Sequence, residues 1–321
     1  MTRPRLLVYR ALGLGDLLTA VPGFVALAEA FPSHRRTLAT TAGVAPLARH
    51  LGLFDEVVET TPFEPLPAAD PADVAVNLHG RGPQSHAVVL AGQPRRLLAF
   101  EHPEVPVSRG GPEWRAGEHE VARWCRLLSE SGVPVDPARL AIEPPRRRLP
   151  AFVRGATVIH PGAASPARRW PAERWAEVAR AERAAGRAVV VTGGAGEVGL
   201  ARAVAARAGL RDEAVLAGRT DVLALAALVA QAGRVACGDT GVAHLATALG
   251  TPSVVLFGPT SPALWGPPPG RGRHVALWAG RTGDPHGDEV DRGLLALTPA
   301  EVVGALATVA GGPAPVRKEA S

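Results

Sequence analysis

The chain has 321 residues, of which 46% are hydrophobic, 20% charged and 4% aromatic, and its formal net charge is +5. This length predicts two domains at about 150 residues each, and the composition excludes a disordered, collagen-like or disulfide-scaffold protein. The charge suits an anionic ligand but is small for a nucleic-acid-binding protein, so we expect no nucleic-acid partner.

Short apolar runs alternate with amphipathic stretches along the first half of the chain. The run at residues 6–9 predicts a buried strand, followed by a glycine turn and an apolar helix over residues 16–30. Further strands are expected at residues 37–40, 56–59, 73–78 and 95–100, and a further helix at residues 118–130. Strands that alternate with helices predict a parallel sheet with helices on both of its faces.

Residues 143–150, Glu-Pro-Pro-Arg-Arg-Arg-Leu-Pro, predict a stiff connector, and we place a hinge at residues 143–152. The alternation then restarts. Strands are expected at residues 157–160, 188–192, 214–216, 235–237 and 253–257, and helices at residues 171–185, 197–208, 221–230, 241–249 and 299–309.

The α/β pattern predicts two doubly wound domains, at residues 1–150 and 151–311, and a disordered tail at residues 312–321. Such sheets bind ligands at the carboxyl ends of their strands, so a cleft between the two domains is the expected site.

The most specific local pattern is Cys-Gly-Asp-Thr-Gly-Val-Ala-His at residues 237–244, which ends a predicted strand and opens a helix. Thr240 is placed to cap that helix, and the free amides of the first turn form an anion site. His244, one turn further on, can face the same ligand. In the alternative interpretation, Asp239 and Thr240 only cap the helix and His244 bonds a buried carbonyl.

A second loop, residues 160–171, offers backbone amides, Ser165 and the arginines Arg168 and Arg169. Arginine forks match phosphate oxygens and keep their charge at any working pH. Lys318 is the only lysine among 35 basic residues, and this arginine bias leaves open that the pair is simply solvated.

A third loop, residues 10–18, places Asp16 at the start of a helix. An aspartate there is often only a favourable partner of the helix dipole. A carboxylate that faces an anion site from the other domain can also serve as a general base. The loop alone leaves both interpretations open.

The glycines Gly194, Gly196 and Gly199 match the dinucleotide-binding pattern G-x-G-x-x-G after a predicted strand. The unit lies late in the chain, so a tight turn that presents Glu197 to a ribose hydroxyl is the preferred interpretation. A nicotinamide-dependent oxidoreductase is kept as an alternative function. No histidine and carboxylate cluster has metal-ligand spacing, and G-x-S-x-G does not occur.

Taken together, these loops resemble glycosyltransferase family 9, the ADP-heptose:lipopolysaccharide heptosyltransferase family. The matching segments are Arg-Ala-Leu-Gly-Leu-Gly-Asp at residues 10–16, His-Pro-Gly-Ala through Arg-Trp-Pro at 160–171, Gly-Gly-Ala-Gly-Glu at 193–197, Gly-Asp-Thr-Gly-Val-Ala-His-Leu-Ala at 238–246 and Phe-Gly-Pro-Thr at 257–260. The resemblance covers about residues 5–265.

The resemblance implies a GT-B fold, with two facing Rossmann-like domains and an interdomain cleft. It implies inverting sugar transfer without a metal or other cofactor. The expected reaction moves a heptose from ADP-heptose to a glycan, a lipid-linked sugar or a metabolite. A non-catalytic protein that binds a nucleotide sugar is a second alternative.

Carried over to this chain, the resemblance makes Asp16 the base. For the donor site, the resemblance implies Glu197, Asp239, Thr240, Gly241 and His244. The loop at residues 160–171 adds Ser165 and Arg168 as further candidates. Arg168 stands where the family carries a lysine, which leaves the donor sugar open. Arg10, Gly15 and Arg81 are the candidates on the acceptor side.

The remaining features concern location. Cys125 and Cys237 lie far apart without metal spacing, as expected for reduced thiols of a cytoplasmic protein. The N-terminus is a poor signal peptide, and no uncharged apolar stretch is long enough to span a membrane. We expect at most peripheral membrane contact.

Overall fold

The computed structural model describes residues 3–67, 71–268 and 272–309. The chain divides into two compact units, Met1–Leu140 and Ala141–Ser321. The proline-rich connector at residues 143–150 thus belongs to the C-terminal unit. The tail expected at residues 312–321 lies outside the described residues.

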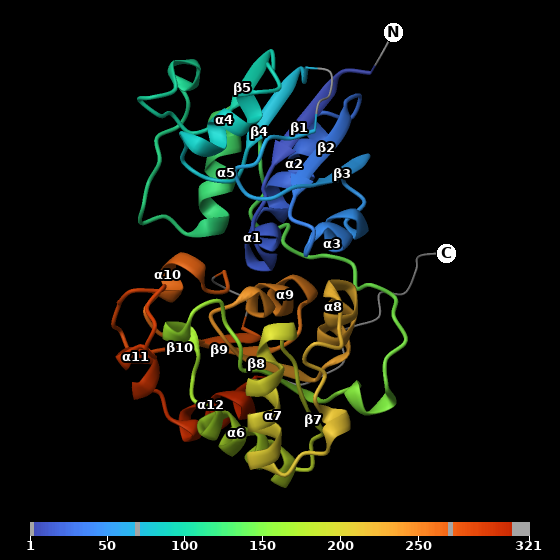
Figure 1. Ribbon diagram of the computed structural model, residues 1–321, viewed down its shortest axis with the longest axis vertical. Helices are drawn as coiled ribbons and strands as arrows, with labels where there is room; N and C mark the ends of the chain where they lie inside the picture. Colours follow the sequence, from blue (N-terminus) through green and yellow to red (C-terminus); the bar gives the residue numbers. More distant parts are fainter. Residues whose placement is uncertain (1–2, 68–70, 269–271, 310–321) are drawn as a thin grey trace. The chain divides into compact units, whose positions relative to one another are not determined.

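The N-terminal unit is built on a five-stranded sheet in the order β3-β2-β1-β4-β5, in which every strand pair is parallel. Its strands are β1 (Arg5–Tyr9), β2 (Arg35–Thr40), β3 (Glu56–Glu59), β4 (Val74–Asn77) and β5 (Arg96–Leu98). Its helices are α1 (Leu14–Thr19), α2 (Val21–Ala30), α3 (Ala45–His50), α4 (Gln84–Leu90) and α5 (Glu120–Glu130). Helices α2 and α5 pack together, and α4 packs against β4 (Figure 1).

The C-terminal unit has a second five-stranded parallel sheet, in the order β10-β9-β8-β6-β7. Its strands are β6 (Thr157–His160), β7 (Val189–Val191), β8 (Arg234–Gly238), β9 (Ser253–Phe257) and β10 (His274–Trp278). Its helices are α6 (Ala172–Ala184), α7 (Val198–Ala208), α8 (Val222–Gln231), α9 (Gly241–Leu249), α10 (Pro262–Trp265), α11 (Arg292–Ala296) and α12 (Pro299–Thr308). Helices α6, α7 and α12 pack as one group, and α8 packs with α9 (Figure 1).

The central strands of both sheets are buried. Every residue of β4, β6 and β9 is buried, as expected for parallel strands covered on both faces. Ile159 of β6 shares a core cluster with Trp175 of α6 and Val204 of α7. The prediction of two parallel α/β sheets is confirmed.

Two predicted elements differ from the structure by more than the position of their ends. The helix expected over residues 16–30 is two helices, because Ala20 ends α1 and starts α2. Pro22 has no amide hydrogen to bond to the preceding turn, and its ring clashes with the carbonyl four residues earlier. The strand expected at residues 214–216 was wrong: a 3-10 turn, Asp212–Ala214, leads only to a single bridge between Val191 and Val215.

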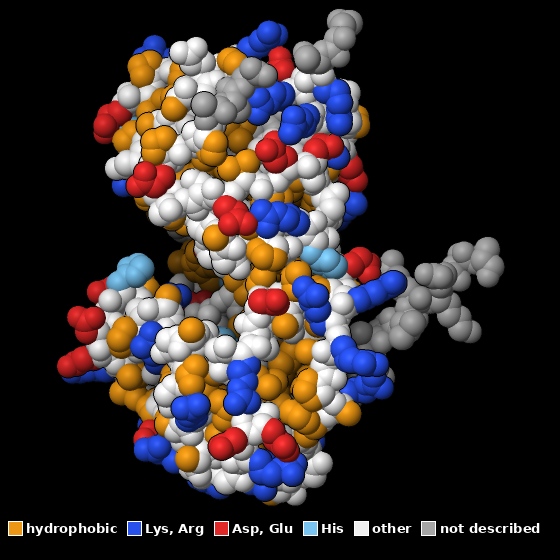
Figure 2. Space-filling view, turned by 45° about the vertical axis from the view of Figure 1, so that its right-hand side comes forward, with side chains coloured by type: hydrophobic (Ala, Val, Ile, Leu, Met, Phe, Trp, Pro, Cys, Tyr) orange, Lys and Arg blue, Asp and Glu red, His pale blue; other side chains and the backbone are white. Residues whose placement is uncertain are grey.

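The surface mixes charges of both signs. On the face in Figure 2, arginine side chains are interspersed with acidic and apolar ones over both units. Salt bridges such as Arg35–Glu56 and Arg49–Glu59 pair some of these charges. Among the described residues, no helix has the length and apolar character needed to cross a membrane.

Candidate functional site

The strand orders indicate where each sheet can bind a ligand. In the N-terminal unit the order reverses between β1 and β4, and in the C-terminal unit between β6 and β8. In doubly wound sheets the loops at the carboxyl ends of such strands diverge and leave a crevice. The loops that carry Asp16, Ser165 and Thr240 are three of the four loops at these positions.

Helix α9 begins directly after β8. Thr240 occupies its N-cap with extended backbone, but the threonine side chain makes no capping hydrogen bond, contrary to our expectation. With no side-chain acceptor at the cap, the first-turn amides of Gly241 and Val242 can bind an anion, and the helix dipole favours negative charge there. Val242, Leu245 and other apolar residues of α9 are buried and hold the helix on the sheet.

Arg168 lies against the loop that precedes α9. Its Nη1 donates to the backbone carbonyl of Asp239 at 3.4 Å and lies 3.7 Å from Oδ2 of the same residue. Its Nε is buried and has no hydrogen-bond partner among the described residues. A buried donor left without a partner costs about 1–3 kcal/mol, so this guanidinium is suited to binding an anionic ligand.

Asp239 itself is buried, with a side chain only 8% exposed. Burial raises the pKa of its carboxyl group, while Arg168 and a hydrogen bond from Thr260 act in the opposite direction. The structure thus brings Arg168, Asp239 and the first turn of α9 together, as the sequence analysis expected.

Glu197 approaches the same sheet edge from the turn after β7. Its Oε2 accepts from the amide of Gly194 at 2.7 Å and lies 3.8 Å from Nε2 of His160. Burial lowers the pKa of His160, so this ring is neutral at pH 7 and its contact with Glu197 is not an ion pair. A Cβ on Gly162 would lie 2.0 Å from Oε1 of Glu197, so only glycine leaves room for the carboxylate.

His160 and Gly162 were not expected from the sequence to be site residues. The available signal was the His-Pro-Gly that follows β6. Its meaning depends on Glu197, which reaches this loop only because β6 and β7 are neighbours in the sheet.

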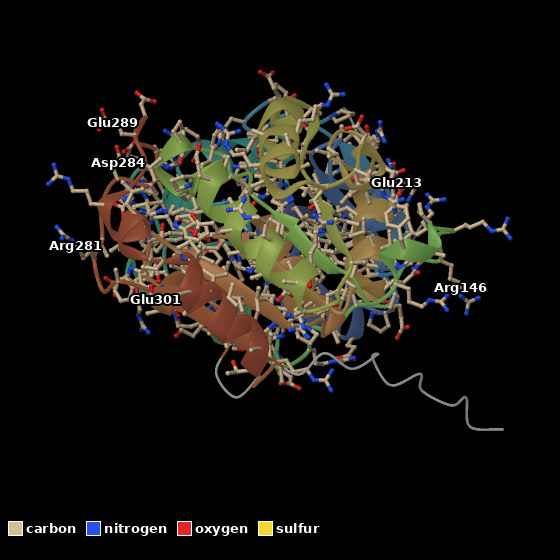
Figure 3. All side chains as sticks on the ribbon, turned by 90° about the horizontal axis from the view of Figure 1, so that it is seen from below. Arg146, Glu213, Arg281, Asp284, Glu289 and Glu301 are labelled. Carbon is tan, nitrogen blue, oxygen red and sulfur yellow. The ribbon has the colours of Figure 1, made fainter. Side chains whose placement is uncertain are left out.

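Ser165 is buried, and its hydroxyl donates to the carbonyl of Pro285. The neighbouring Ala167 donates its amide to Gly287 at 3.1 Å. In Figure 3, Asp284 and Glu289 of this same segment lie at the outer rim of the C-terminal unit. Ser165 therefore holds the loop in place, and its hydroxyl could donate to a phosphate oxygen only if its bond to Pro285 broke.

His244 lies one turn into α9, where its ring meets Trp265 of α10 edge-on at 5.8 Å between centroids. The predicted dinucleotide loop is placed less favourably. Strand β7, which precedes it, is at the edge of its sheet rather than at the reversal of strand order. This position argues against a nicotinamide site there.

Asp16 is in the first turn of α1 in the N-terminal unit. Its Oδ2 accepts from the Gly13 amide at 3.3 Å, and its side chain is 27% exposed. Its pKa is raised above the ordinary aspartate value by burial and by Glu120, against the opposing effect of Arg10, whose Nη2 is 3.6 Å from Oδ1. A carboxylate that is both accessible and raised in pKa can accept a proton from a substrate hydroxyl.

Arg10 is fully buried and bonded to the protein. It donates to the backbone carbonyls of Asp16 and Leu78, and its Nη2 lies 3.1 Å from both the Thr19 hydroxyl and a Glu120 oxygen. Its guanidinium also stacks over Trp124 at 4.7 Å. These contacts favour a role in positioning Asp16, rather than the acceptor contact expected for Arg10.

The other acceptor-side candidates are placed differently. Arg81 is exposed in the loop after β4, where it can reach a ligand, and Gly15 lies inside α1. The sequence suggested that Gly13 and Gly15 permit a tight turn. Neither has positive φ, and Gly13 has extended backbone that other residues can adopt.

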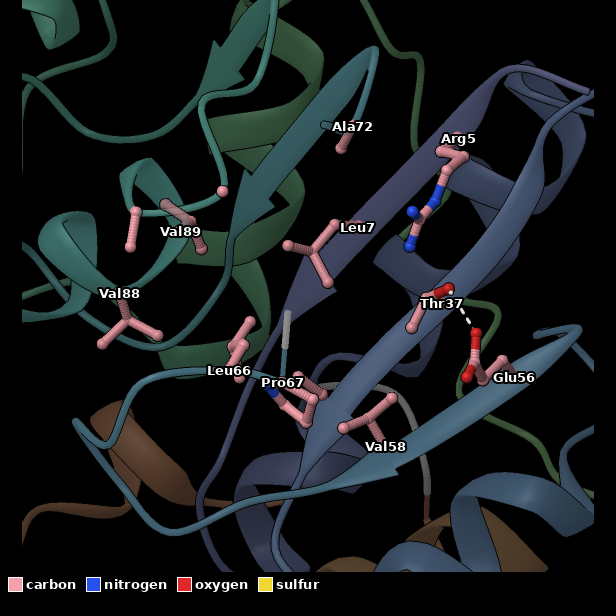
Figure 4. A pocket seen from close by; sticks show the side chains of 13 residues that line it. Arg5, Leu7, Thr37, Glu56, Val58, Leu66, Pro67, Ala72, Val88 and Val89 are labelled. Atoms are coloured by element: carbon pink, nitrogen blue, oxygen red, sulfur yellow. Dashed lines mark hydrogen bonds between the residues drawn. The ribbon is translucent and has the colours of Figure 1, made fainter. Parts of the chain in front are cut away.

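A cavity of about 330 Å³ opens elsewhere on the N-terminal unit (Figure 4). Leu7, Val58, Val88 and Val89 supply apolar lining, and a hydrogen bond joins Thr37 to Glu56 at its side. None of the predicted site residues lines it. Groups of three or more potential metal ligands are also absent from the described residues.

Comparison with known proteins decides the family. Residues 112–289 match the model of glycosyltransferase family 9 (heptosyltransferase). This chain belongs to glycosyltransferase family 9. The resemblance stated from its loops is therefore confirmed.

Curated heptosyltransferases align with part of the chain. Lipopolysaccharide heptosyltransferase 2 of Escherichia coli K12 is 31% identical over 150 residues, which are 44% of this chain and 43% of that protein. Lipopolysaccharide heptosyltransferase 1 of Pseudomonas aeruginosa is 30% identical over 160 residues, 47% of this chain and 42% of that protein. The chain thus spans less than half the length of the curated relatives it matches.

Solved structures align over nearly the whole chain and support the fold. A family 9 glycosyltransferase of Veillonella parvula superposes with a TM-score of 0.75 at 19% identity, covering 95% of this chain and 97% of that one. The ADP-heptose lipopolysaccharide heptosyltransferase II of E. coli gives a TM-score of 0.72 at 20% identity, covering 95% and 98%. The GT-B fold class of two parallel α/β domains is confirmed.

Proposed function

We propose that this family 9 protein is an inverting, metal-independent glycosyltransferase that transfers a heptose from ADP-heptose to a hydroxyl of a glycan or lipid-linked acceptor. The observation that carries the proposal is the buried, unpartnered Nε of Arg168 beside the first turn of α9. Together these groups offer a fixed positive charge and free amides to a diphosphate. An E. coli heptosyltransferase of the same fold has been solved with ADP.

The proposed reaction needs one base and one anion site. Asp16 takes the proton as the O–H bond of the acceptor breaks, and the acceptor oxygen forms a bond to the anomeric carbon. The bond from that carbon to the phosphate oxygen breaks on the opposite side, and ADP leaves with the electron pair. Arg168 and the amides of α9 stabilise the departing charge by preorganised electrostatics, so no metal is required.

The remaining donor residues have complementary proposed roles. Glu197 accepts hydrogen bonds from the ribose hydroxyls, and Thr240 and His244 contact the diphosphate and sugar. The amide of Gly194, which donates to the Glu197 carboxylate at 2.7 Å, keeps that carboxylate in place. No coenzyme takes part, and we propose a cytoplasmic protein with at most peripheral membrane contact and no nucleic-acid partner.

Sugar transfer in excess EDTA tests this function directly. ADP-heptose and a deacylated, heptose-free lipopolysaccharide core oligosaccharide should give free ADP and a product larger by one heptose, measured by mass spectrometry. The NMR coupling constants of the product should report inversion at the anomeric carbon. Transfer that stops in EDTA and returns with Mg²⁺ or Mn²⁺ would refute metal independence, and binding without ADP release would indicate a non-catalytic protein.

Arg168→Gln should weaken ADP binding about 10–150-fold, because one charge-assisted contact contributes roughly 1.5–3 kcal/mol. Calorimetric titration of ADP measures this change. The matched control is Arg202→Gln, an exposed arginine on α7 of the same unit, which should leave the dissociation constant unchanged. Equal affinities for the wild-type protein and Arg168→Gln would remove Arg168 from the donor site.

A further inference from the structure

An aromatic cluster lies at the carboxyl edge of the N-terminal sheet and has no role in the steps above. Phe63 follows β3 and is 55% exposed. Its ring meets His79 edge-on at 4.9 Å between centroids, and His79 stacks on Tyr9 at 4.6 Å with an angle of 11° between the rings. We call Tyr9, Phe63 and His79 the aromatic cluster. A single exposed apolar residue is ordinary, so the cluster needs further observations to indicate a ligand.

The backbone of Phe63 supplies one of them. Its φ is 66°, in the left-handed region that a bulky residue rarely occupies. The Phe63 amide donates to the buried hydroxyl of Tyr9 at 2.9 Å, which holds this conformation. Unfavourable backbone that the surrounding structure maintains is found preferentially at functional sites. Here it presents an aromatic ring to solvent.

His79 supplies the second observation. Its Nδ1 accepts from the Ala11 amide at 3.2 Å. Burial, assisted by the positive charge of Arg10, lowers the pKa of His79 to about 4, so the ring is neutral at pH 7. With Nδ1 used as an acceptor, the single ring hydrogen is on Nε2, which has no hydrogen-bond partner among the described residues. The cluster therefore combines an exposed aromatic surface with an oriented N–H donor.

The position of the cluster relates it to Asp16. Tyr9 is paired with Asn77, so the loops after β1 and β4 start at the same edge of the sheet. Tyr9 packs in the cluster of apolar residues that includes Val88 of α4, whereas Arg10, the next residue, binds Glu120 of α5. The aromatic cluster and the Arg10–Asp16 pair are thus on the two sides of the end of β1.

We propose that Phe63 and His79 form an acceptor subsite for a sugar ring next to the one that carries the reacting hydroxyl. The C–H face of this ring packs on Phe63, because the negative face of an aromatic ring attracts polarised hydrogens. The Nε2–H of His79 donates to an oxygen substituent of the same ring. The inference rests on the proposed function, since it describes the acceptor as an oligosaccharide rather than a monosaccharide or small metabolite.

The test measures acceptor kinetics and binding separately, with the deacylated core oligosaccharide as the probe. Phe63→Ala should raise the KM for this acceptor about 10-fold, with kcat within a few-fold and ADP affinity unchanged. Saturation-transfer NMR from protein to oligosaccharide should weaken in parallel. Phe63→Tyr should restore the wild-type KM and the wild-type saturation transfer. Phe63→Leu, which keeps an apolar side chain without an aromatic face, should restore neither.

Val107→Ala is the matched control, because Val107 is an exposed apolar residue of the same unit, 62% exposed, and lies outside the aromatic cluster. It should leave both measurements at wild-type values. If the wild-type protein transfers sugar and Phe63→Ala or Phe63→Leu matches its KM, the subsite is wrong while the proposed function stands. If the wild-type protein binds ADP but neither binds the oligosaccharide nor transfers a sugar to it, the subsite and the proposed function are both wrong.

Discussion

Replacing Asp16 by asparagine should lower the turnover number for sugar transfer about 10²–10⁴-fold, the usual contribution of a general base. Asparagine keeps the shape of the side chain and can still accept from the Gly13 amide, but it cannot take the proton. The affinity for ADP should stay within about two-fold, because the groups proposed to bind ADP belong to the C-terminal unit. Single-turnover rates and calorimetric titration of ADP measure the two effects.

Asp221→Asn is the matched control for this variant. Asp221 also lies at a helix N-terminus, where its Oδ1 accepts from the amide of Ala224 at 2.7 Å. Losing a carboxylate at such a position costs about 0.3–1 kcal/mol of stability through the helix dipole. If Asp16→Asn keeps its activity as Asp221→Asn does, Asp16 is only a partner of the helix dipole and the proposed mechanism is wrong.

The pH dependence of kcat gives an independent check on Asp16. Its carboxyl group must be ionised to accept a proton, so activity falls as the pH is lowered through its pKa. Because burial raises that pKa, the acid limb should lie above the value near 3.9 of an ordinary aspartate. The pH profile of the residual kcat of Asp16→Asn should lack this acid limb.

Glu120→Ala should produce the largest loss of stability. The carboxylate is 5% exposed and binds Arg10 at 3.1 Å, Arg123, and the indole nitrogen of Trp124 at 2.7 Å. Removing one partner of a buried ion pair costs about 3–5 kcal/mol, because the remaining charge is left unpaired. Chemical denaturation of the full chain, followed by a spectroscopic probe in the N-terminal unit, should show this loss. The exposed Glu113, mutated to alanine, should change the free energy of unfolding by at most about 0.5 kcal/mol.

Glu120→Gln separates the electrostatic effect from the packing effect. Glutamine can still accept hydrogen bonds, so the fold should be retained better than in Glu120→Ala. The negative charge of Glu120 raises the pKa of Asp16, and its loss leaves Arg10 more strongly attracted to Asp16. Both effects lower the pKa of Asp16, so the acid limb of kcat should move to lower pH. A limb that stays in place would contradict this coupling.

Local patterns in the sequence determined most of the secondary structure. β6 and β9 begin and end where their apolar runs predicted, as does helix α9, which follows a Gly-Asp-Thr-Gly turn and ends at Gly250 with left-handed backbone. These elements depend on burial periodicity and on caps within a few residues, which are local properties. The same local logic fails for β10, which follows a Gly/Pro/Arg-rich stretch and whose five residues are only partly buried.

Unlike the secondary structure, the candidate site is formed by contacts between residues that are far apart in the sequence. The sequence suggested Asp16, Arg168 and Glu197 as candidates, because each follows a strand in a loop of unusual composition. It did not show that Arg10 is buried against Glu120, 110 positions away, or that the Ser165 hydroxyl is bonded to Pro285, 120 positions away. It also did not indicate that Phe63 reaches Tyr9 and His79. Strand order and loop packing bring these groups together, and both are set by the burial of whole sheets, so no short stretch of sequence encodes them.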